Sequence, residues 1–202
     1  MAVKNHALDD RIVEAARAEF LEKGFRGASL SRITERAGIT TGALYTRYKN
    51  KDDLFCSLVR EVLDIAGQDM GRMYEAYSAA QTSGDPKQIL DVIHQEERVY
   101  LDLLMEHREA CFLLFCRSDG SSLEQKLNTM MDRKAQQTEA YFQSIAKPGA
   151  EVDGLGFIIS SQLHFFRQIL EKNYDREKTL RCMRTVTRYM EAGWTAIFEE
   201  IF

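Results

Sequence analysis

Residues 30–54, LSRITERAGITTGALYTRYKNKDDL, decide the fold of this chain. The pattern predicts a short helix over residues 30–37, a tight turn at Gly38 and a second short helix over residues 40–48. Two short helices joined by a turn of three or four residues that contains glycine define a helix-turn-helix. The second helix of such a motif enters the major groove of DNA. This stretch therefore predicts a DNA-reading module.

Polar residues stand where the helices of this module should begin. Ser29 is the expected N-cap of the first short helix and Thr40 that of the second, because a hydroxyl oxygen there can accept from a free backbone N–H. Asn50 is expected to cap a long helix that reaches about residue 80, with Asp53 as its acidic partner three residues later. The caps and the apolar pattern agree on where each helix starts.

The residues before the motif predict one more helix. Ile12, Ala16 and Phe20 recur every four residues over a helix expected at residues 9–23, with charges on its other face. Gly24 is the expected stop signal, and Phe25 is expected to fold back onto the apolar stripe. The three helices form the predicted DNA-binding domain, residues 1–51.

The remaining residues, 52–202, predict a helical bundle. The chain has only two prolines, Pro86 and Pro148, and no alternating run of β-branched residues that would indicate a strand. Helices are predicted over residues 86–104, 110–116, 123–146, 155–170 and from 176 to near the end. The predicted fold class is all-α, with about nine helices in total.

The charge of the chain is unevenly distributed. Residues 1–51 carry 10 Lys+Arg and 6 Asp+Glu, whereas residues 52–202 carry 17 and 25, so the net charge of −4 combines a basic module with an acidic body. This fits an anionic partner that meets only one end, although a chance fluctuation would explain it too. No window approaches the ~20 consecutive apolar residues of a membrane span, and the N-terminus lacks the apolar stretch of a secretory signal. We expect a cytoplasmic protein with no membrane partner.

Residues 30–54 resemble the DNA-binding signature of TetR-family regulators. The resemblance continues upstream through the pattern at residues 12–25 and covers about the first sixty residues. Two residues depart from it, since Arg47 stands where the family often has His or Tyr, and Tyr48 where it most often has Phe. The matching residues are Ala37, Gly38, Ile39, Thr40, Gly42, Leu44, Tyr45, Tyr48, Asn50, Lys51 and Leu54.

The side chains of this segment predict a DNA-contact surface. Thr40 can cap the recognition helix and meet a phosphate, and Thr41 offers a methyl and a hydroxyl to base edges. Gly42 allows close approach to DNA, and Ala43 suits a thymine methyl. Contacts to phosphates give salt-dependent affinity without reading the sequence. The predicted contact residues are Ser29, Thr40, Thr41, Gly42, Ala43, Tyr45, Arg47, Lys49 and Lys51.

The resemblance implies that residues 52–202 bind a small-molecule inducer and dimerise. Aromatic and methionine side chains would line a pocket between helices, although plain core packing explains each of them as well. Glu96 or Glu97 falls in the apolar stripe of its helix, where a carboxylate could bind a cationic ligand. A stripe that turns to solvent there, or a pairing with Arg98, would explain the same residues. The predicted ligand residues are Met73, Tyr77, Glu96, Tyr100, Phe112, Phe115, Phe142, His164 and Phe165.

The last two predicted helices carry the expected dimer interface. The helix at 155–170 is apolar on two faces, and the final helix has apolar residues at alternating steps of three and four, which is the spacing of nearly parallel or antiparallel packed helices. Together they could form half of an intersubunit four-helix bundle. Both faces could instead be used inside one monomer. The predicted interface residues are Leu155, Ile159, Phe166, Met183, Thr187, Met190, Trp194 and Ile197.

Catalytic, metal and redox chemistry have little support in the sequence. There is no Ser/His/Asp set, metal-ligand cluster or phosphate loop, so we expect neither an enzyme nor a cofactor. Cys56, Cys111, Cys116 and Cys182 show no CxxC spacing and are expected to be reduced. They leave a redox-responsive regulator as a competing hypothesis.

The function predicted from these features is a ligand-responsive transcriptional repressor. It would bind a near-palindromic, double-stranded operator as a homodimer and leave it when a small lipophilic or aromatic inducer binds. The sequence is also compatible with a transcriptional activator of the same fold and with a structural DNA-binding protein that has no ligand.

Overall fold

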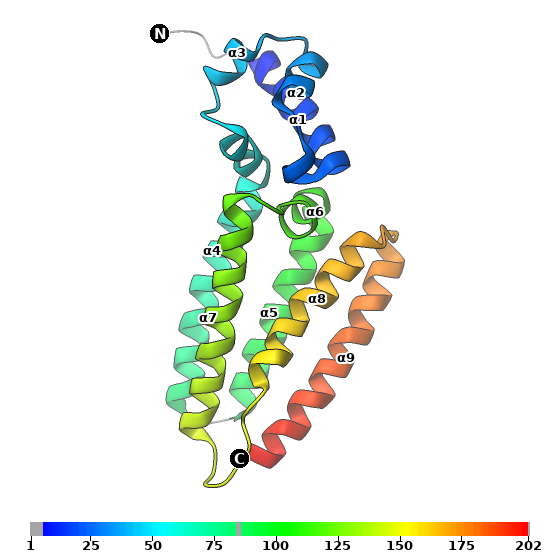
Figure 1. The fold of residues 1–202 in the computed structure, drawn as a ribbon. Coiled ribbons are helices and arrows are strands. Elements are labelled where there is room, and N and C mark those ends of the chain that lie inside the picture. The colour runs from blue at the N-terminus through cyan, green and yellow to red at the C-terminus, as the bar shows by residue number, and fades with distance from the viewer. Residues whose placement is uncertain (1–5, 84–85, 202) are drawn as a thin grey trace. The chain divides into compact units, whose positions relative to one another are not determined.

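The computed structural model describes residues 6–83 and 86–201. Every regular element in these residues is a helix, which confirms the all-α prediction and the number of helices (Figure 1). None of the helices described is long and apolar enough to cross a lipid bilayer. The helices are α1 (His6–Gly27), α2 (Leu30–Ala37), α3 (Thr41–Tyr45), α4 (Lys51–Ser83), α5 (Pro86–Glu106), α6 (Arg108–Cys116), α7 (Ser122–Ile145), α8 (Leu155–Glu171) and α9 (Arg176–Ile201).

The chain forms two compact units. Unit 1 comprises the described residues of Met1–Leu63 together with Glu109–Lys126, and unit 2 those of Asp64–Arg108 together with Leu127–Phe202. Helices α4 and α7 each begin in unit 1 and end in unit 2. The boundary predicted between residues 51 and 52 does not coincide with the boundaries of the compact units. As a division between DNA binding and ligand binding it stays a prediction.

Helix α1 is interrupted at Gly24, where the sequence predicted its stop. Gly24 has φ 67° and ψ 171°, a backbone conformation open almost only to glycine. The break turns Phe25 back against Phe20 of α1 and Phe55 of α4, with ring centroids 6.2 and 5.3 Å away. The Phe25 N–H donates to the Arg117 carbonyl over 2.8 Å. One residue therefore sets the path of the chain into the helix-turn-helix.

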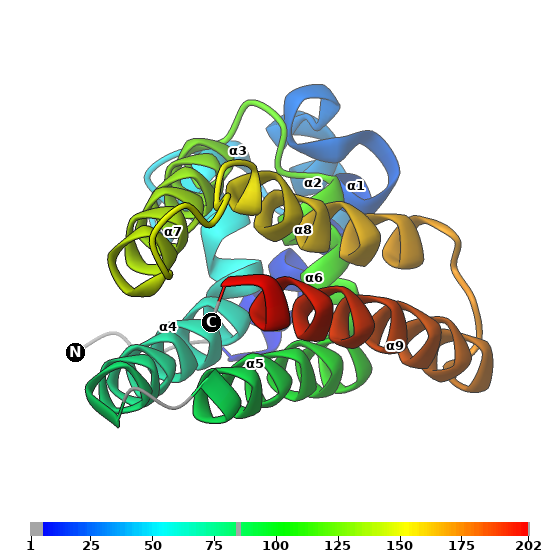
Figure 2. The same ribbon diagram turned by 90° about the horizontal axis from the view of Figure 1, so that it is seen from below.

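The core of unit 2 is built mainly from α5, α7, α8 and α9. Helix α9 lies beside both α5 and α8 (Figure 2). Trp194 of α9 stacks on Phe142 of α7, with centroids 5.9 Å apart and the ring planes at 20°. The buried residues of this core are Ala80, Val92, Ile93, Phe142, Val152, Leu155, Ile159, Met190, Trp194, Phe198 and Ile201.

This core corrects the predicted dimer interface. Leu155, Ile159, Phe166, Met190 and Trp194 are each less than a tenth exposed, because they pack against neighbouring helices of their own chain. A side chain that is covered to this extent has almost no surface left for a second subunit. These five residues are therefore used for packing inside one monomer. Ile197 is partly buried against the same core.

Replacement of Gly24 should destabilise the protein far more than replacement of the neighbouring Gly27. Gly24→Ala forces an alanine into the conformation with φ 67°, at a cost of about 1–3 kcal/mol. At Gly27 an added Cβ meets Lys23 Cβ at 3.5 Å, an ordinary contact within α1, so Gly27→Ala should be neutral or stabilising by up to ~1 kcal/mol. Urea unfolding measures both, and equal midpoints would contradict the strain argument.

Candidate nucleic-acid interface

The turn between α2 and α3 depends on a left-handed glycine. Gly38 has φ 64° and ψ 43°, and its N–H donates to the Glu35 carbonyl over 3.1 Å. The Ile39 N–H donates to the Thr34 carbonyl over 3.0 Å, so the last carbonyls of α2 are satisfied. The Arg11 guanidinium donates to the Gly38 carbonyl over 3.1 Å and ties the turn to α1. The predicted helix-turn-helix is confirmed.

Helix α3 begins as predicted but ends earlier. The Thr40 hydroxyl accepts from the Ala43 N–H over 3.2 Å, which confirms its capping role. The helix was expected to reach residue 48, whereas it ends at Tyr45 and the chain continues as a turn. The Thr46 hydroxyl donates to the Ala43 carbonyl over 2.7 Å, a bond that competes with the helical pattern.

The short helix α3 presents polar and small groups to solvent. Thr40, Thr41 and Gly42 are exposed at its N-terminal end, and Ala43 is partly exposed. Tyr45 is 53% exposed, so its ring is not part of the module's core. Leu44, on the opposite side, is 1% exposed and anchors α3 to the module. The exposed end has the arrangement that a recognition helix needs, with free backbone N–H groups and small side chains.

Ser29 does not cap α2 with its side chain, contrary to prediction. It occupies the N-cap position, but its hydroxyl makes no capping bond, and its own N–H donates to Glu19 Oε1 over 3.2 Å. Glu19 is 2% exposed. A carboxylate from α1 thus accepts from the N–H of the N-cap residue, and ten residues of separation hide this contact from sequence patterns.

Two cations of the predicted contact set have partners inside the module. Arg47 Nε donates to Asp9 Oδ1 over 2.5 Å, and its Nη1 donates to the Ala43 carbonyl over 3.3 Å. Lys51 Nζ donates to the Ala28 carbonyl over 3.2 Å and lies 4.6 Å from the Phe25 ring centroid. Both side chains therefore hold α1 and the start of α4 to the helix-turn-helix. Lys49 is exposed.

The cap of α4 is confirmed and is reciprocal. Asn50 Oδ1 accepts from the Asp53 N–H over 2.8 Å, and Asp53 Oδ2 accepts from the Lys49 N–H over 2.9 Å. The second bond is made one residue earlier than in the usual capping box. It fixes the backbone that joins α3 to α4.

Residues 117–122 contact both ends of this module, which the sequence did not indicate. Arg117 Nε donates to the Leu21 carbonyl over 3.1 Å. Asp52, in the first turn of α4, accepts from the Ser122 N–H over 2.8 Å and from the Ser122 hydroxyl over 2.6 Å. The segment between the helices predicted over residues 110–116 and 123–146 is therefore bonded to α1 and α4 within unit 1.

The predicted ligand residues do not form one set. Phe112 and Phe115 belong to unit 1, whereas the other described members belong to unit 2. Phe142 is buried core, and Tyr77 and Phe165 pack partly buried against that core. Tyr100 lies against Phe166 with ring centroids 6.2 Å apart, and His164 is exposed. The side chains of Met73 and Glu96 lie outside the described residues. Among the groups that are described, no three His, Cys, Asp or Glu side chains gather as a metal site would require.

The geometry of unit 1 defines a helix-turn-helix module. Residues 12–58 match the family described as "Bacterial regulatory proteins, tetR family". This match spans the break at Gly24, the turn at Gly38 and the capped start of α4. This segment therefore carries a DNA-binding domain of the TetR family.

Relatives of known name agree with this assignment. The fatty acid metabolism regulator protein of Bacillus subtilis is 25% identical over 77% of this chain and 76% of its own length. The regulator AcrR of Shigella flexneri is 33% identical over 79 residues, which cover 39% of this chain and 34% of AcrR. The second match is therefore confined to a third of its relative.

Solved structures show the same fold. NalD, described as the secondary repressor of the MexAB-OprM multidrug efflux pump in Pseudomonas aeruginosa, superposes with a TM-score of 0.58 and 21% identity, over 90% of this chain and 95% of NalD. FadR from Bacillus subtilis, in complex with stearoyl-CoA, superposes with a TM-score of 0.52 and 20% identity, over 87% of this chain and 96% of FadR. At these identities the likeness establishes the fold.

Lys51 and Lys49 should differ sharply when each is replaced by methionine. Lys51→Met removes the bonds to the Ala28 and Arg26 carbonyls and the contact with Phe25, and should lower the free energy of unfolding by about 1–2 kcal/mol. Lys49→Met changes an exposed side chain and should stay within ~0.5 kcal/mol. Chemical denaturation measures the free energy of unfolding of both variants. An equal decrease in both would contradict the structural role assigned to Lys51.

Proposed function

We propose that this protein is a ligand-responsive transcriptional repressor that binds a near-palindromic operator as a homodimer. The observation that carries the proposal is α3, whose exposed N-terminal end is capped by Thr40 and anchored by the buried Leu44. Two relatives lend support, because NalD is described as a repressor and FadR was solved with stearoyl-CoA. A small molecule that lowers operator affinity is therefore the proposed mode of control.

The proposed DNA contacts follow from the chemistry of α3 and the residues after it. Thr41, Gly42 and Ala43 would face base edges in the major groove. The free N–H groups at the start of α3 and the exposed cation of Lys49 would meet phosphates. Arg47 and Lys51 already use some of their N–H donors in contacts inside the module. Only the remaining donors would reach DNA, so the first role of both side chains is to hold the recognition helix in place.

The proposed dimer surface is the outer face of α8 and α9. Phe157 of α8 is 83% exposed and Tyr189 of α9 is 70% exposed, unusual values for large apolar side chains. Ala192 and Ala196 are also exposed and follow Tyr189 at helical spacing. Small residues beside a projecting ring allow two helices to approach closely. Exposed apolar faces of this kind mark protein contacts, and a second copy of the chain would bury them around a twofold axis.

The proposed coupling between ligand and operator runs through α4. This helix begins beside the helix-turn-helix and ends in unit 2, and Asp52 at its start is bonded to Ser122 at the start of α7. A ligand that favours another arrangement of α4 and α7 in unit 2 would displace the recognition helices and change the spacing between them. Such coupling is reciprocal, so operator DNA would weaken ligand binding by the same factor.

A redox-responsive regulator is the weaker hypothesis. Burial raises the pKa of the Cys56 thiol, and the nearby Asp52 carboxylate also raises it, although a bond with the Ser122 hydroxyl acts in the opposite sense. A thiol with a raised pKa is less often a thiolate and so less reactive. Cys111 is fully buried. Neither thiol has the exposed, electropositive surroundings of a redox sensor.

Operator binding should depend on Lys49 through salt. A sequence enriched by the full chain from a random duplex library should contain two half-sites about one helical turn apart. Lys49→Gln should make the slope of log affinity against log salt less steep by about 1.8, because the dimer loses two phosphate contacts. Lys147→Gln, which removes one exposed lysine of unit 2, should leave the slope unchanged. If the library yields no enriched sequence, the chain is not a sequence-specific regulator.

The dimer surface should be sensitive to charge. Phe157→Glu and Tyr189→Glu should each raise the dimer dissociation constant by at least ~30-fold, since a symmetric dimer buries every substitution twice. Met130→Glu alters an exposed methionine of α7 and is the control. Light scattering coupled to gel filtration reads the mass. Dimers that persist in both α8 and α9 variants would place the interface elsewhere.

A further inference from the structure

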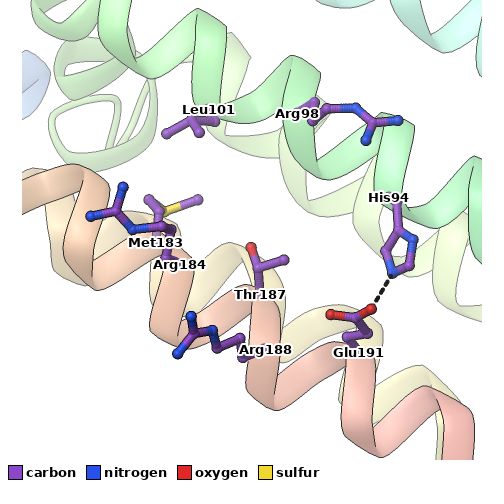
Figure 3. Close-up of a pocket in the computed structure, with 8 residues that line it drawn as sticks. All are labelled: His94, Arg98, Leu101, Met183, Arg184, Thr187, Arg188 and Glu191. Carbon is purple, nitrogen blue, oxygen red and sulfur yellow. Dashed lines mark ion pairs between the residues drawn. The ribbon is translucent and has the colours of Figure 1, made fainter.

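Unit 2 contains a groove between α5 and α9 that the proposed dimer surface does not use. Its volume is about 370 Å³, within the usual range for small-molecule sites. Helix α5 contributes His94, Arg98 and Leu101 to one side, and the other side consists of residues from α9 (Figure 3). The α9 residues are Met183, Arg184, Thr187, Arg188 and Glu191.

The charge of the groove is opposite to that of the surrounding chain. Among the lining residues whose side chains the structure describes, three arginines and one glutamate give a net charge of +2 with His94 counted as neutral. Residues 52–202 as a whole carry 25 Asp+Glu against 17 Lys+Arg. Local positive charge in an otherwise acidic body attracts anions to one place.

The groove arginines are not used to hold the fold. Within residues 6–83 and 86–201, Arg98, Arg184 and Arg188 make no hydrogen bond or ion pair. By contrast, Arg181, about one turn before Arg184 on α9, pairs with Glu177. The guanidinium groups of Arg98, Arg184 and Arg188 point in different directions in Figure 3 and keep their donors available. Guanidinium is the side chain best suited to carboxylate and phosphate oxygens.

The groove also differs between its ends. Leu101 and Met183 lie at one end, and His94 and Glu191 lie at the other, 3.9 Å apart between Nε2 and Oε1 (Figure 3). The His94 Nε2 atom is buried and has no hydrogen-bond partner among the described residues. A buried ring nitrogen without a partner is costly, and a ligand oxygen or hydroxyl would satisfy it.

We propose that this groove binds an amphipathic anion, meaning a carboxylate or phosphate joined to an apolar chain. The oxyanion would accept from the arginine donors while the apolar part lies on Leu101 and Met183. This rests on the proposed function, in that the bound anion would be the effector of the regulator. It also changes the chemistry expected from sequence, where Glu96 suggested a cationic ligand.

The groove and the dimer surface can be occupied together. Thr187 and Glu191 line the groove, and Tyr189, two residues from each, belongs to the outer face. Residues two apart on a helix point to widely different sides. Helix α9 therefore directs Tyr189 to a different side from Thr187 and Glu191.

The first experiment measures binding to the full-length chain without DNA. Isothermal titration calorimetry with dodecanoate and with dodecyl phosphate, both below their micellar concentrations, distinguishes the two possible headgroups. We expect at least one to bind, with dodecanol and dodecylammonium at least tenfold weaker because they lack the oxyanion. Equal binding of dodecanol, or equal binding of inorganic phosphate alone, would overturn the proposal.

The second step assigns the binding to the groove. Arg98→Gln and Arg184→Gln should each weaken the bound anion about tenfold or more, as expected for a lost charge-assisted bond. Arg133→Gln, which alters an exposed arginine of α7, is the matched control and should stay within twofold. Because the groove arginines have no partner among the described residues, the variants should keep the wild-type unfolding midpoint. Unchanged affinity in both groove variants would overturn the assignment.

The same variants separate this inference from the proposed function. If an anion binds the groove of the wild type but leaves operator affinity unchanged, the site stands and its role as the effector site is wrong. If the chain binds no anion but still binds its operator, the proposed anion site is wrong and the proposed function as a regulator stands.

Discussion

The packing of Phe25 against Phe20 and Phe55 is the contact on which unit 1 depends. It joins α1 to α4 across the helix-turn-helix, and it exists because Gly24 reverses the chain with a positive φ. Lys51 lies over the same ring, and the carbonyl of Arg117 accepts from the Phe25 N–H. The orientation of α3 is therefore set by a small aromatic core and a few bonds around it. A DNA reader requires this rigidity, because its side chains must arrive in the groove already positioned.

Local signals allowed most of unit 1 to be predicted from sequence. The break at Gly24, the turn at Gly38 and the caps at Thr40 and Asn50 are set by neighbours a few residues away, and the structure confirms each. Contacts between distant residues were missed. Asp9 is 38 residues from Arg47, and the Asp52–Ser122 contact spans 70 residues. Apolar periodicity carries no information about such polar pairs.

Unit 2 shows a different limit of sequence reasoning. The alternating steps of three and four in α9 predict a packed seam, and the seam exists, but the spacing cannot tell whether the partner helix belongs to the same chain or to another. The structure places Met190 and Trp194 inside the monomer and leaves Tyr189 outside. The groove arginines were equally hidden, since charges on a helix usually mean a solvated face. Only the apposition of α5 and α9 gathers Arg98 with Arg184 and Arg188.

The burial of Trp194 has a spectroscopic consequence. It is the only tryptophan of the chain, it is 1% exposed, and it stacks on Phe142 in the core of unit 2. Its emission therefore reports the loosening of that unit alone, while far-ultraviolet circular dichroism follows the helices of both. Coincident transitions in the two signals would mean that both units melt as one cooperative body. Separated transitions would give each unit its own stability, obtained without labels or truncations.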